Sequence, residues 1–413
     1  MRYLALGILV FLLAWPPACT QDVGPRATSA AGPRIRVRLL ESVPAVRLAS
    51  PQSPSVWLDS APVAVRLAAN SGVQISLASG QWILGGVKLS SGVLTIRTAS
   101  PGPMRINGVA YRGFFCFVPV SGDKFDAVND VEVDDYLKGV VPAEMYPNWH
   151  PEAYKAQAVA ARTYALYESR TAGANRYWDV YADARSQMYG GLDRETAQAR
   201  QAVDDTAGIV LTYGPGDGKI FKAYFSSCCG GVTQAAADAF PGEPYIQPLA
   251  EQNHGRCCNQ SKYFNWGPIT LGKQELTRRI RLWAQRRSQA EGRTFPEATM
   301  APLYRIDVQA TNRYGRPSRV LISDARGTQY SLAAEEMRGA INTDAPAGTT
   351  LPSSFCKING DPNADAVTFY DGHGFGHGVG MCQWCAEALA AAGHSYEQIL
   401  LSAYPQAKLV RAY

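Results

Sequence analysis

The chain has 413 residues, of which 46% are hydrophobic and 18% are charged. This composition excludes a disordered chain, because it supplies ample apolar material for a core, and the length predicts roughly two or three domains. The formal net charge of +5 is too small and too scattered to indicate a nucleic-acid partner. The 38 Gly and 26 Pro residues follow no collagen-like period. They therefore predict many turns in a globular protein with substantial β structure.

Residues 1–20 have the features of an export signal. Arg2 precedes an apolar stretch at residues 4–15, which is followed by Pro and small residues. About 12 apolar residues are too few to cross ~30 Å of hydrocarbon as a stable helix, and no later stretch is as long. We predict export to the periplasm or cell envelope, with no transmembrane segment after the signal. Two outcomes stay open, namely cleavage near residues 18–20 and lipidation of Cys19, which would anchor the protein.

Eight cysteines remain when Cys19 is set aside from the nine in the chain. An even number in an exported chain favours disulfides, although the sequence does not choose among the pairings. We expect at least two of the eight to be bridged, with the two vicinal pairs as the main partners. The eight are Cys116, Cys228, Cys229, Cys257, Cys258, Cys356, Cys382 and Cys385.

Short runs of alternating apolar and polar residues follow a small, polar linker at residues 21–34. Period-2 alternation interrupted by Ser, Gly and Pro is typical of half-buried antiparallel strands. Residues 35–128 are therefore predicted to form a β-rich module. The predicted strands are 35–39, 63–67, 73–77, 94–97 and 114–120.

A mixed core is predicted to begin at residue 129, and the periodicity changes at Pro151. Residues 151–166 are rich in Ala, with Pro151 at the favoured first helical position, and predict a central helix. The fold class is therefore α+β, with a β-rich N-terminal module and a mixed α/β core at residues 129–413. An inserted helix and strand subdomain is expected near residues 257–350. Further predicted elements are helices at 195–207, 275–291, 382–391 and 396–402, and strands at 208–212, 304–310 and 318–323.

Glu144 lies in the densest candidate site, the run Val-Val-Pro-Ala-Glu-Met. It stands between a strand-like apolar run at residues 137–141 and Pro147. Partial removal from water would raise its pKa, which suits a general acid. Lys155 and Arg162 are seven positions apart on the predicted helix and so share one face. The alternative is a solvated loop carboxylate with two surface cations.

A second candidate site is the Gly-rich segment at residues 371–385. Its glycines permit close approach of the backbone, and it contains His373, His377 and two cysteines. The spacing His-x3-His-x4-Cys-x2-Cys resembles a set of zinc ligands. Against zinc, exported cysteines usually oxidise and so Gly-rich a loop is a poor rigid frame. The other interpretation is a structural or active-site loop.

Several segments occur together in one order along residues 35–413. They are Val128-Asn129-Asp130 through Tyr136-Leu137-Lys138-Gly139-Val140-Val141-Pro142-Ala143-Glu144-Met145, then 155–164, Asp183 with Ser186-Gln187-Met188-Tyr189, the turn at 226–233, Leu351-Pro352-Ser353, and 374–381 running to Tyr404-Pro405. In this order they resemble the SpoIID/LytB family, named for the stage II sporulation protein D. Each segment alone is a weak signal, whereas several in register are strong.

The resemblance implies a lytic transglycosylase that cleaves peptidoglycan glycan strands between N-acetylmuramic acid and N-acetylglucosamine, leaving a 1,6-anhydro end. Glu144 maps to the catalytic acid and base. Lys155, Arg162, Gln187 and His377 are the residues we expect to orient the sugar or stabilise an oxocarbenium-like transition state. Aromatic side chains are expected to stack on sugar faces, and the candidates are Tyr146, Trp149 and Tyr189.

The chain departs from the family pattern at two places. Some sporulation members hold zinc through a His and two Cys, and here the corresponding positions are Tyr181 and Ser186. No metal and no other cofactor is therefore expected. The usual Ser after Gly-Val-Gly-Met is Cys382, and the cysteine pairs are an addition that brings disulfides or another metal site into consideration.

Two alternatives of other classes stay open. The first is a non-catalytic glycan-binding module that stimulates a cell-wall amidase, because the LytB name is attached to such modifiers. The second is a zinc-dependent hydrolase that uses His373 and His377. The expected partners are glycan strands and a cell-wall amidase, with no nucleic acid.

Overall fold

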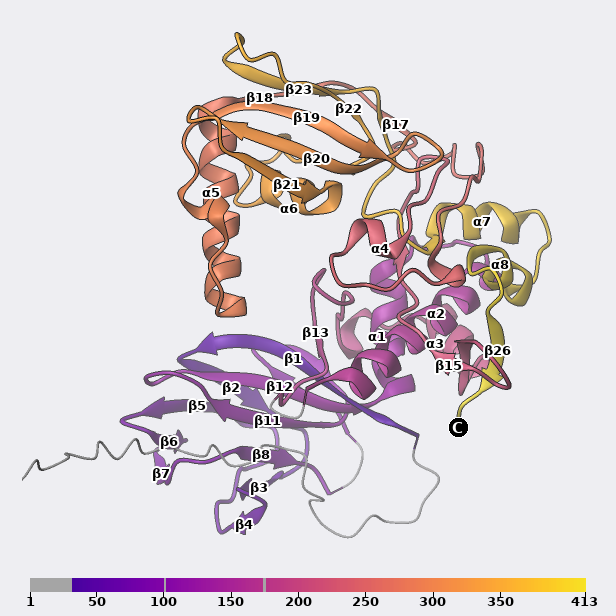
Figure 1. Ribbon diagram of the computed structural model, residues 1–413. Coiled ribbons are helices and arrows are strands. Elements are labelled where there is room, and N and C mark those ends of the chain that lie inside the picture. Colours follow the sequence, from indigo (N-terminus) through magenta and orange to yellow (C-terminus); the bar gives the residue numbers. More distant parts are fainter. Residues whose placement is uncertain (1–31, 100–101, 174–175) are drawn as a thin grey trace, which may run out of the picture. The chain divides into compact units, whose positions relative to one another are not determined.

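The computed structural model describes residues 32–99, 102–173 and 176–413 (Figure 1). The predicted export signal and Cys19 lie outside these residues. The chain divides into two compact units, of which the first contains the described residues up to Glu132 and Glu168–Gln187, and the second contains Val133–Tyr167 and Met188–Tyr413. The predicted α+β class is confirmed. No helix among the described residues is both long enough and apolar enough to cross a membrane.

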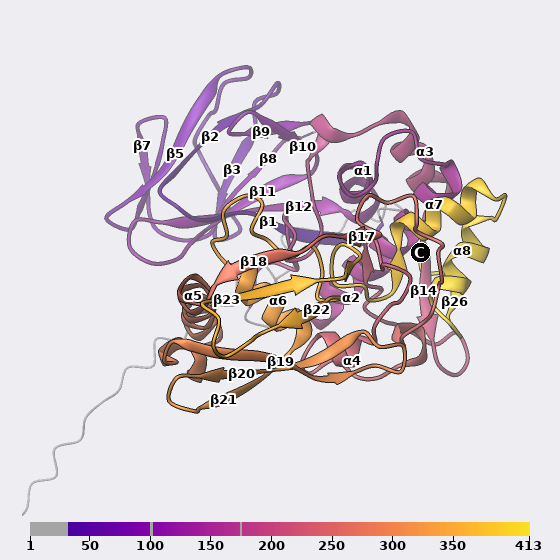
Figure 2. The same cartoon turned by 90° about the horizontal axis from the view of Figure 1, so that it is seen from above.

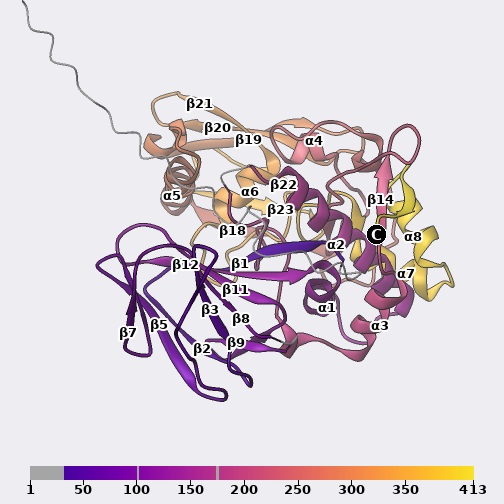
Figure 3. The same ribbon diagram turned by 90° about the horizontal axis from the view of Figure 1, so that it is seen from below.

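The first unit contains two sheets (Figure 3). The larger has the strand order β13-β1-β12-β11-β8-β3-β4 and the smaller β10-β9-β2-β5-β6-β7. Neighbouring strands are antiparallel except β1 and β13, which run parallel. The strands are β1 (Arg34–Val43), β2 (Ala45–Ala49), β3 (Ser55–Leu58), β4 (Ala61–Val63), β5 (Gly72–Ala78), β6 (Gln81–Leu84), β7 (Val87–Leu89), β8 (Leu94–Arg97), β9 (Met104–Ile106), β10 (Val109–Tyr111), β11 (Phe114–Pro119), β12 (Phe125–Glu132) and β13 (Val180–Tyr181).

The predicted strands at 35–39, 73–77, 94–97 and 114–120 are confirmed as β1, β5, β8 and β11 within a few residues. In β1, Ile35 and Val37 are fully buried while Arg36 between them is not. The prediction for residues 63–67 is wrong beyond Val63. The backbone N–H of Val65 donates to the carbonyl of Val63 in a tight turn, so the chain leaves the sheet there although its apolar side chains still face the core.

The second unit is centred on two helices, α1 (Val133–Glu144) and α2 (Pro151–Thr171). The Ala-rich prediction for α2 is confirmed, and its middle is completely buried. The strand-like interpretation of residues 137–141 is wrong, because these residues lie within α1. Tyr136, Leu137, Val140 and Val141 are buried together, and their spacing of three and four positions is that of one helical face.

The remaining elements around α2 are short. Three small sheets have the orders β15-β14-β26, β16-β25 and β17-β24, and α7 packs beside α8 (Figure 2). The predicted helices at 195–207, 382–391 and 396–402 and the strand at 208–212 are confirmed within a few residues. The elements are η1 (Leu192–Arg194), α3 (Ala197–Asp205), β14 (Ile209–Tyr213), β15 (Lys219–Ile220), β16 (Phe225–Ser226), α4 (Ala236–Ala239), η2 (Gln247–Leu249), β17 (Asn265–Trp266), β24 (Gly372–His373), β25 (Met381–Cys382), α7 (Gln383–Ala391), α8 (Tyr396–Ala403) and β26 (Lys408–Arg411).

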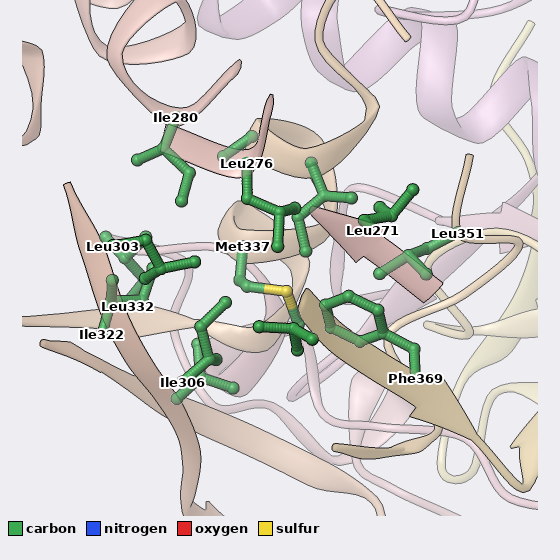
Figure 4. Packing of buried hydrophobic residues seen from close by; sticks show 14 of the residues in the cluster. Leu271, Leu276, Ile280, Leu303, Ile306, Ile322, Leu332, Met337, Leu351 and Phe369 are labelled. Atoms are coloured by element: carbon green, nitrogen blue, oxygen red, sulfur yellow. The ribbon is translucent and has the colours of Figure 1, made fainter. Parts of the chain in front are cut away.

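A helix and strand region lies between β17 and β24 in the chain. It has two three-stranded antiparallel sheets, β18-β23-β22 and β19-β20-β21. Its apolar core joins Leu276 and Ile280 of the long helix to Met337, Ile306 and Phe369 (Figure 4). The predicted helix and strand pair are confirmed here. The elements are β18 (Ile269–Gly272), α5 (Lys273–Glu291), η3 (Pro296–Thr299), β19 (Leu303–Thr311), β20 (Pro317–Asp324), β21 (Gln329–Ala333), α6 (Ala334–Asn342), β22 (Lys357–Asn359) and β23 (Ala366–Tyr370).

Candidate functional site

Glu144 is the last residue of α1, and its side chain is half-buried. The backbone N–H of Met188 donates to its Oε1 atom at 2.7 Å, and the side chain of Gln383 donates a second hydrogen bond. Burial raises the pKa of Glu144, and these two donors oppose that rise because they favour the ionised form. No cation and no second carboxylate among the described residues perturbs this pKa. A lone carboxyl that retains its proton above the ordinary range is suited to general acid chemistry.

Close backbone packing places Met188 against Glu144. A Cβ atom at Gly139 would lie 2.8 Å from the ring of Tyr189 and 2.9 Å from the carbonyl of Gly191, so glycine is needed for α1 to approach this segment. The N–H of Gly190 donates to the Gly139 carbonyl at 3.3 Å. The segment that supplies the Met188 donor is therefore fixed to the same helix that carries the carboxylate.

Gln383 reaches the site from a segment about 240 positions away in the sequence. It is the first residue of α7, which directly follows β25, and β25 pairs in parallel with β16. The buried side chain of Gln383 also donates from Nε2 to Oε1 of Gln157 on α2 at 3.3 Å. This bond holds the amide between α2 and the carboxylate.

Three aromatic side chains that pack on one another follow Glu144 and Gln383 in the chain. Tyr146 and Trp149 come after Glu144, and Trp384 comes directly after Gln383. We call these three residues the aromatic trio. Ring centroids are 5.1 Å apart for Tyr146 and Trp149, 5.6 Å for Tyr146 and Trp384, and 4.8 Å for Trp149 and Trp384. Tyr146 is 45% exposed. Large rings of this kind offer apolar faces to a ligand.

Arg162 does not line an open site. Its side chain is 0% exposed and its Nε donates to Oδ1 of Asp134 at 2.8 Å. The guanidinium also donates to the carbonyls of Val203 and Ile209, each at 3.2 Å. Arg162 was expected from the sequence to bind substrate, and this expectation is wrong. Its guanidinium N–H groups are bonded to α1, α3 and β14, and so they hold α2 to these elements.

Lys155 is placed on the surface of α2 with two carboxylate partners. Its Nζ lies 3.0 Å from Glu152 and 3.3 Å from Asp205 on α3. These ion pairs raise the pKa of Lys155, first through the hydrogen bond to Glu152. The structure thus gives Lys155 partners between α2 and α3, and its predicted contact with substrate stays a prediction.

Gln187 and Tyr189 are both buried, although both were expected to bind substrate. Gln187, the last residue of the first unit, is 0% exposed. Tyr189 is 7% exposed and packs on Tyr136 with ring centroids 4.8 Å apart. Neither side chain presents a surface on which a sugar can lie, so the residue that contributes from this segment is Met188, through its backbone.

His377 was expected to bind substrate, and the structure gives its ring partners within the protein. Its Nδ1 accepts a hydrogen bond from the N–H of Val379 at 3.0 Å, and its ring bonds to the backbone of Phe225. Burial lowers its pKa to about 4, so the ring is neutral at pH 7. The ring also packs against Tyr224 and Phe240. His377 therefore holds the Gly-rich loop to β16 instead of acting on Glu144.

The expected disulfides are not formed in the structure. All eight cysteines of the described residues are free. The Sγ atoms of four of them, Cys229, Cys258, Cys382 and Cys385, lie within 4.8 Å of one another. The other four, Cys116, Cys228, Cys257 and Cys356, are outside this group. His373 and His377 are outside it too, and His373 instead bonds to Oδ1 of Asn265 at 2.8 Å.

Glu144, Tyr146 and Trp149 were expected in the site from the sequence, whereas Gln383 and Trp384 were not. The signal for both was available, since they stand inside the Gly-rich segment that had already been singled out. What the sequence did not give was the pairing of β25 with β16 that brings this segment to Glu144.

Comparison with known proteins places residues 121–213 in a family model described as SpoIID, stage II sporulation protein. This range contains α1, Glu144, α2 and α3.

Relatives extend the similarity over most of the chain. An uncharacterized protein of Brachyspira hyodysenteriae is 30% identical over 296 residues, which cover 71% of both chains. The stage II sporulation protein D of Bacillus subtilis is 24% identical over 309 residues, covering 71% of this chain and 79% of that protein. The amidase enhancer of Bacillus subtilis is 27% identical over 304 residues, which cover 65% of this chain and 39% of that longer protein.

Proposed function

The chain belongs to the SpoIID family, and from this premise we propose that it is an exported peptidoglycan lytic transglycosylase with Glu144 as its catalytic acid and base. The observation that carries the proposal is the state of this carboxyl group. It is half-buried, its pKa is raised by burial, and it is met by two hydrogen-bond donors and by no cation among the described residues. It can therefore deliver a proton and afterwards be stabilised as an anion.

The proposed reaction needs one carboxyl group. Protonated Glu144 gives its proton to the glycosidic oxygen as the bond from that oxygen to C1 of the muramic acid breaks. The C6 hydroxyl of the same sugar then attacks C1, and Glu144 takes the hydroxyl proton. The products are a free N-acetylglucosamine hydroxyl and a 1,6-anhydro muramic acid end, and Glu144 is again protonated.

The proposed reaction differs from ordinary glycoside hydrolysis in the number of carboxyl groups that it needs. A hydrolase uses two, roughly 5–10 Å apart, whereas Glu144 alone serves as acid and base here. The Met188 N–H and the Gln383 amide supply the stabilisation that the ionised group needs midway through the reaction.

The aromatic trio supplies a surface for the glycan next to the carboxyl group. Tyr146 follows Glu144 by two positions, and Trp384 follows Gln383 directly. Stacking of pyranose rings on these faces would hold the strand while leaving Glu144 free to act. The exposed edge of the trio at Tyr146 is where we expect the sugar to lie.

A second candidate function is stimulation of a cell-wall amidase without cleavage of the glycan. It is favoured by the similarity to a protein named amidase enhancer. This function needs the aromatic trio for glycan binding but does not need Glu144 to titrate as an acid. The two functions therefore differ in what they require of a single side chain.

Digestion of purified sacculi, with mass spectrometry of the products, tests the proposal. The wild-type protein should release fragments with 1,6-anhydro ends, and Glu144→Gln should lose at least about 100-fold in rate because an amide cannot deliver the proton. Glu152→Gln is the matched control, since Glu152 lies on α2 and pairs with Lys155, and it should keep the activity.

The same variants separate the two candidate functions. Release of anhydro ends by Glu144→Gln at the wild-type rate would remove Glu144 as the catalytic residue. If the wild-type protein releases none but accelerates an added cell-wall amidase, and Glu144→Gln does so equally, the second function replaces the first.

A further inference from the structure

Four cysteines from three distant segments meet at one point, and we call Cys229, Cys258, Cys382 and Cys385 the cysteine group. All four are buried and their Sγ atoms lie within 4.8 Å of one another. The Sγ atoms of Cys229 and Cys258 are 3.6 Å apart. A tetrahedral zinc ion with Zn–S bonds of about 2.3 Å separates its sulfur ligands by about 3.8 Å. We propose that the cysteine group binds one zinc ion in a closed, structural site.

The pairing of two short strands brings three of these cysteines together. β16 and β25 run in parallel with Ser226 opposite Cys382. Cys229 lies three positions beyond Ser226, and Cys385 lies three positions beyond Cys382. The backbone N–H of Cys229 also points at Sγ of Cys382, at 3.3 Å, and such donors support a metal-bound thiolate.

Two consecutive glycines let the fourth cysteine approach. Gly230 and Gly231 have φ of +67° and +95°, which disfavours other residues. A Cβ at Gly230 would lie 2.7 Å from the N atom of Gly374, and one at Gly231 would lie 2.5 Å from the carbonyl of Gly255. The turn that carries Cys258 and the Gly-rich loop therefore both pack directly on the backbone that follows Cys229.

A buried arginine fixes the surroundings of the cysteine group. Arg316 is 1% exposed, and it donates to the carbonyl of Cys229 at 3.3 Å and to that of His377 at 2.9 Å. The same guanidinium lies 3.8 Å from the carboxylate of Glu335. The outer contacts of the proposed site are thus hydrogen-bonded, as metal sites commonly require.

The spacing of the four sulfur donors favours a single tetrahedral ion over a multi-iron cluster. Soft thiolates in a tetrahedral arrangement select zinc or an iron–sulfur cluster, and a multi-iron cluster would stand between the sulfurs and spread them beyond their present separation. Four protein ligands leave no position for a water, so the site is structural rather than catalytic. This differs from the sequence-based expectation of disulfides and no metal. Binding releases the four thiol protons.

The proposed zinc would position part of the Glu144 site. Gln383 and Trp384 lie between the ligands Cys382 and Cys385, so the ion would fix the first turn of α7 and with it the amide that bonds Glu144. This positioning role rests on the proposed function, whereas metal binding itself does not. Loss of zinc and loss of activity are therefore separate measurements.

Metal analysis of the mature chain, purified without added metal, tests the site directly. We expect one zinc per chain, and after chelation in denaturant all eight described cysteines should react as thiols. Cobalt(II) exchanged into the wild-type protein should give the visible bands of a tetrahedral tetrathiolate. Absence of metal together with two disulfides within the cysteine group would overturn the proposal, as would iron with acid-labile sulfide.

Neighbouring cysteines provide matched controls. Cys258→Ser should lose zinc and melt at a lower temperature, while Cys257→Ser, one position away and outside the group, should keep it. Cys356→Ala, buried elsewhere in the same unit, should keep it as well. Full zinc content in Cys258→Ser would overturn the assignment of ligands, and if this variant does not fold, the cobalt spectrum of the wild-type protein decides.

Discussion

The two ends of α1 carry carboxylates that differ in their hydrogen-bond donors, which include a cation at one end and are neutral at the other. At the N-terminal end, Asp134 accepts from Arg162 at 2.8 Å and from the hydroxyl of Tyr413 at 2.9 Å. At the C-terminal end, Glu144 accepts from the backbone N–H of Met188 and from the amide of Gln383, and burial raises its pKa. The helix dipole favours an anion at the first position and disfavours one at the second.

The difference teaches which charged groups are available for chemistry. Asp134 and Arg162 satisfy each other, so their charges contribute to stability and leave nothing to donate or accept from a ligand. Glu144 has a pKa that burial raises, which fits the acid role proposed for it. From the sequence both Arg162 and Glu144 were expected to act in the site, and their different burial and partners distinguish them.

Substitution of Arg162 should give the largest difference between the two ends of α1. Arg162→Met should lower the free energy of unfolding by about 3–5 kcal/mol, because Asp134 and the carbonyls of Val203 and Ile209 lose their buried cation. Glu144→Gln should change it by less than about 1 kcal/mol. Denaturant unfolding followed by circular dichroism measures both. Equal stability of Arg162→Met and the wild-type protein would show that the network around Arg162 is not structural.

The sequence patterns predicted the helices and strands better than they predicted which of these elements contact one another. α2 was predictable because Ala and an initial Pro act locally, and Glu144 was predictable because its apolar neighbours are adjacent in the chain. The same apolar neighbours misled the assignment of α1, since Val-rich runs suit strands as well as buried helices. The cysteine group and Gln383 depend on the pairing of β16 with β25 across more than 150 positions, which no local pattern contains.

Substitution of His377 should have a smaller effect than that of Arg162. The ring of His377 forms hydrogen bonds to backbone groups, so we expect it to contribute to stability. His377→Ala should cost about 1–3 kcal/mol through the donor of Val379 and the carbonyl of Phe225, and activity should fall together with the melting temperature. The pKa of His377 is lowered from 6.5 to about 4. Between these values the unfolded chain binds the additional proton, so stability decreases as pH falls through this window.

His377→Ala should lack this decrease in stability between pH 6.5 and about 4. Melting curves recorded between pH 4 and 7 for the variant and for the wild-type protein measure the difference. A large loss of turnover with an unchanged melting temperature would instead place His377 at the substrate.

The smallest expected effect concerns Gln383, whose amide donates to the carboxylate of Glu144. Removing a donor that favours the ionised form raises the pKa of an acid. Because the proposed reaction begins with protonated Glu144, activity falls as pH rises through this pKa, and Gln383→Ala should move that fall to higher pH by on the order of one unit or less. The measurement is the pH profile of kcat/KM on sacculi.

Tyr146→Ala, which alters the aromatic trio without touching the amide, should weaken glycan binding but leave the profile in place. A profile unmoved in Gln383→Ala would mean that burial and the Met188 N–H set the ionisation of Glu144 without Gln383, and that α7 contributes only the aromatic surface.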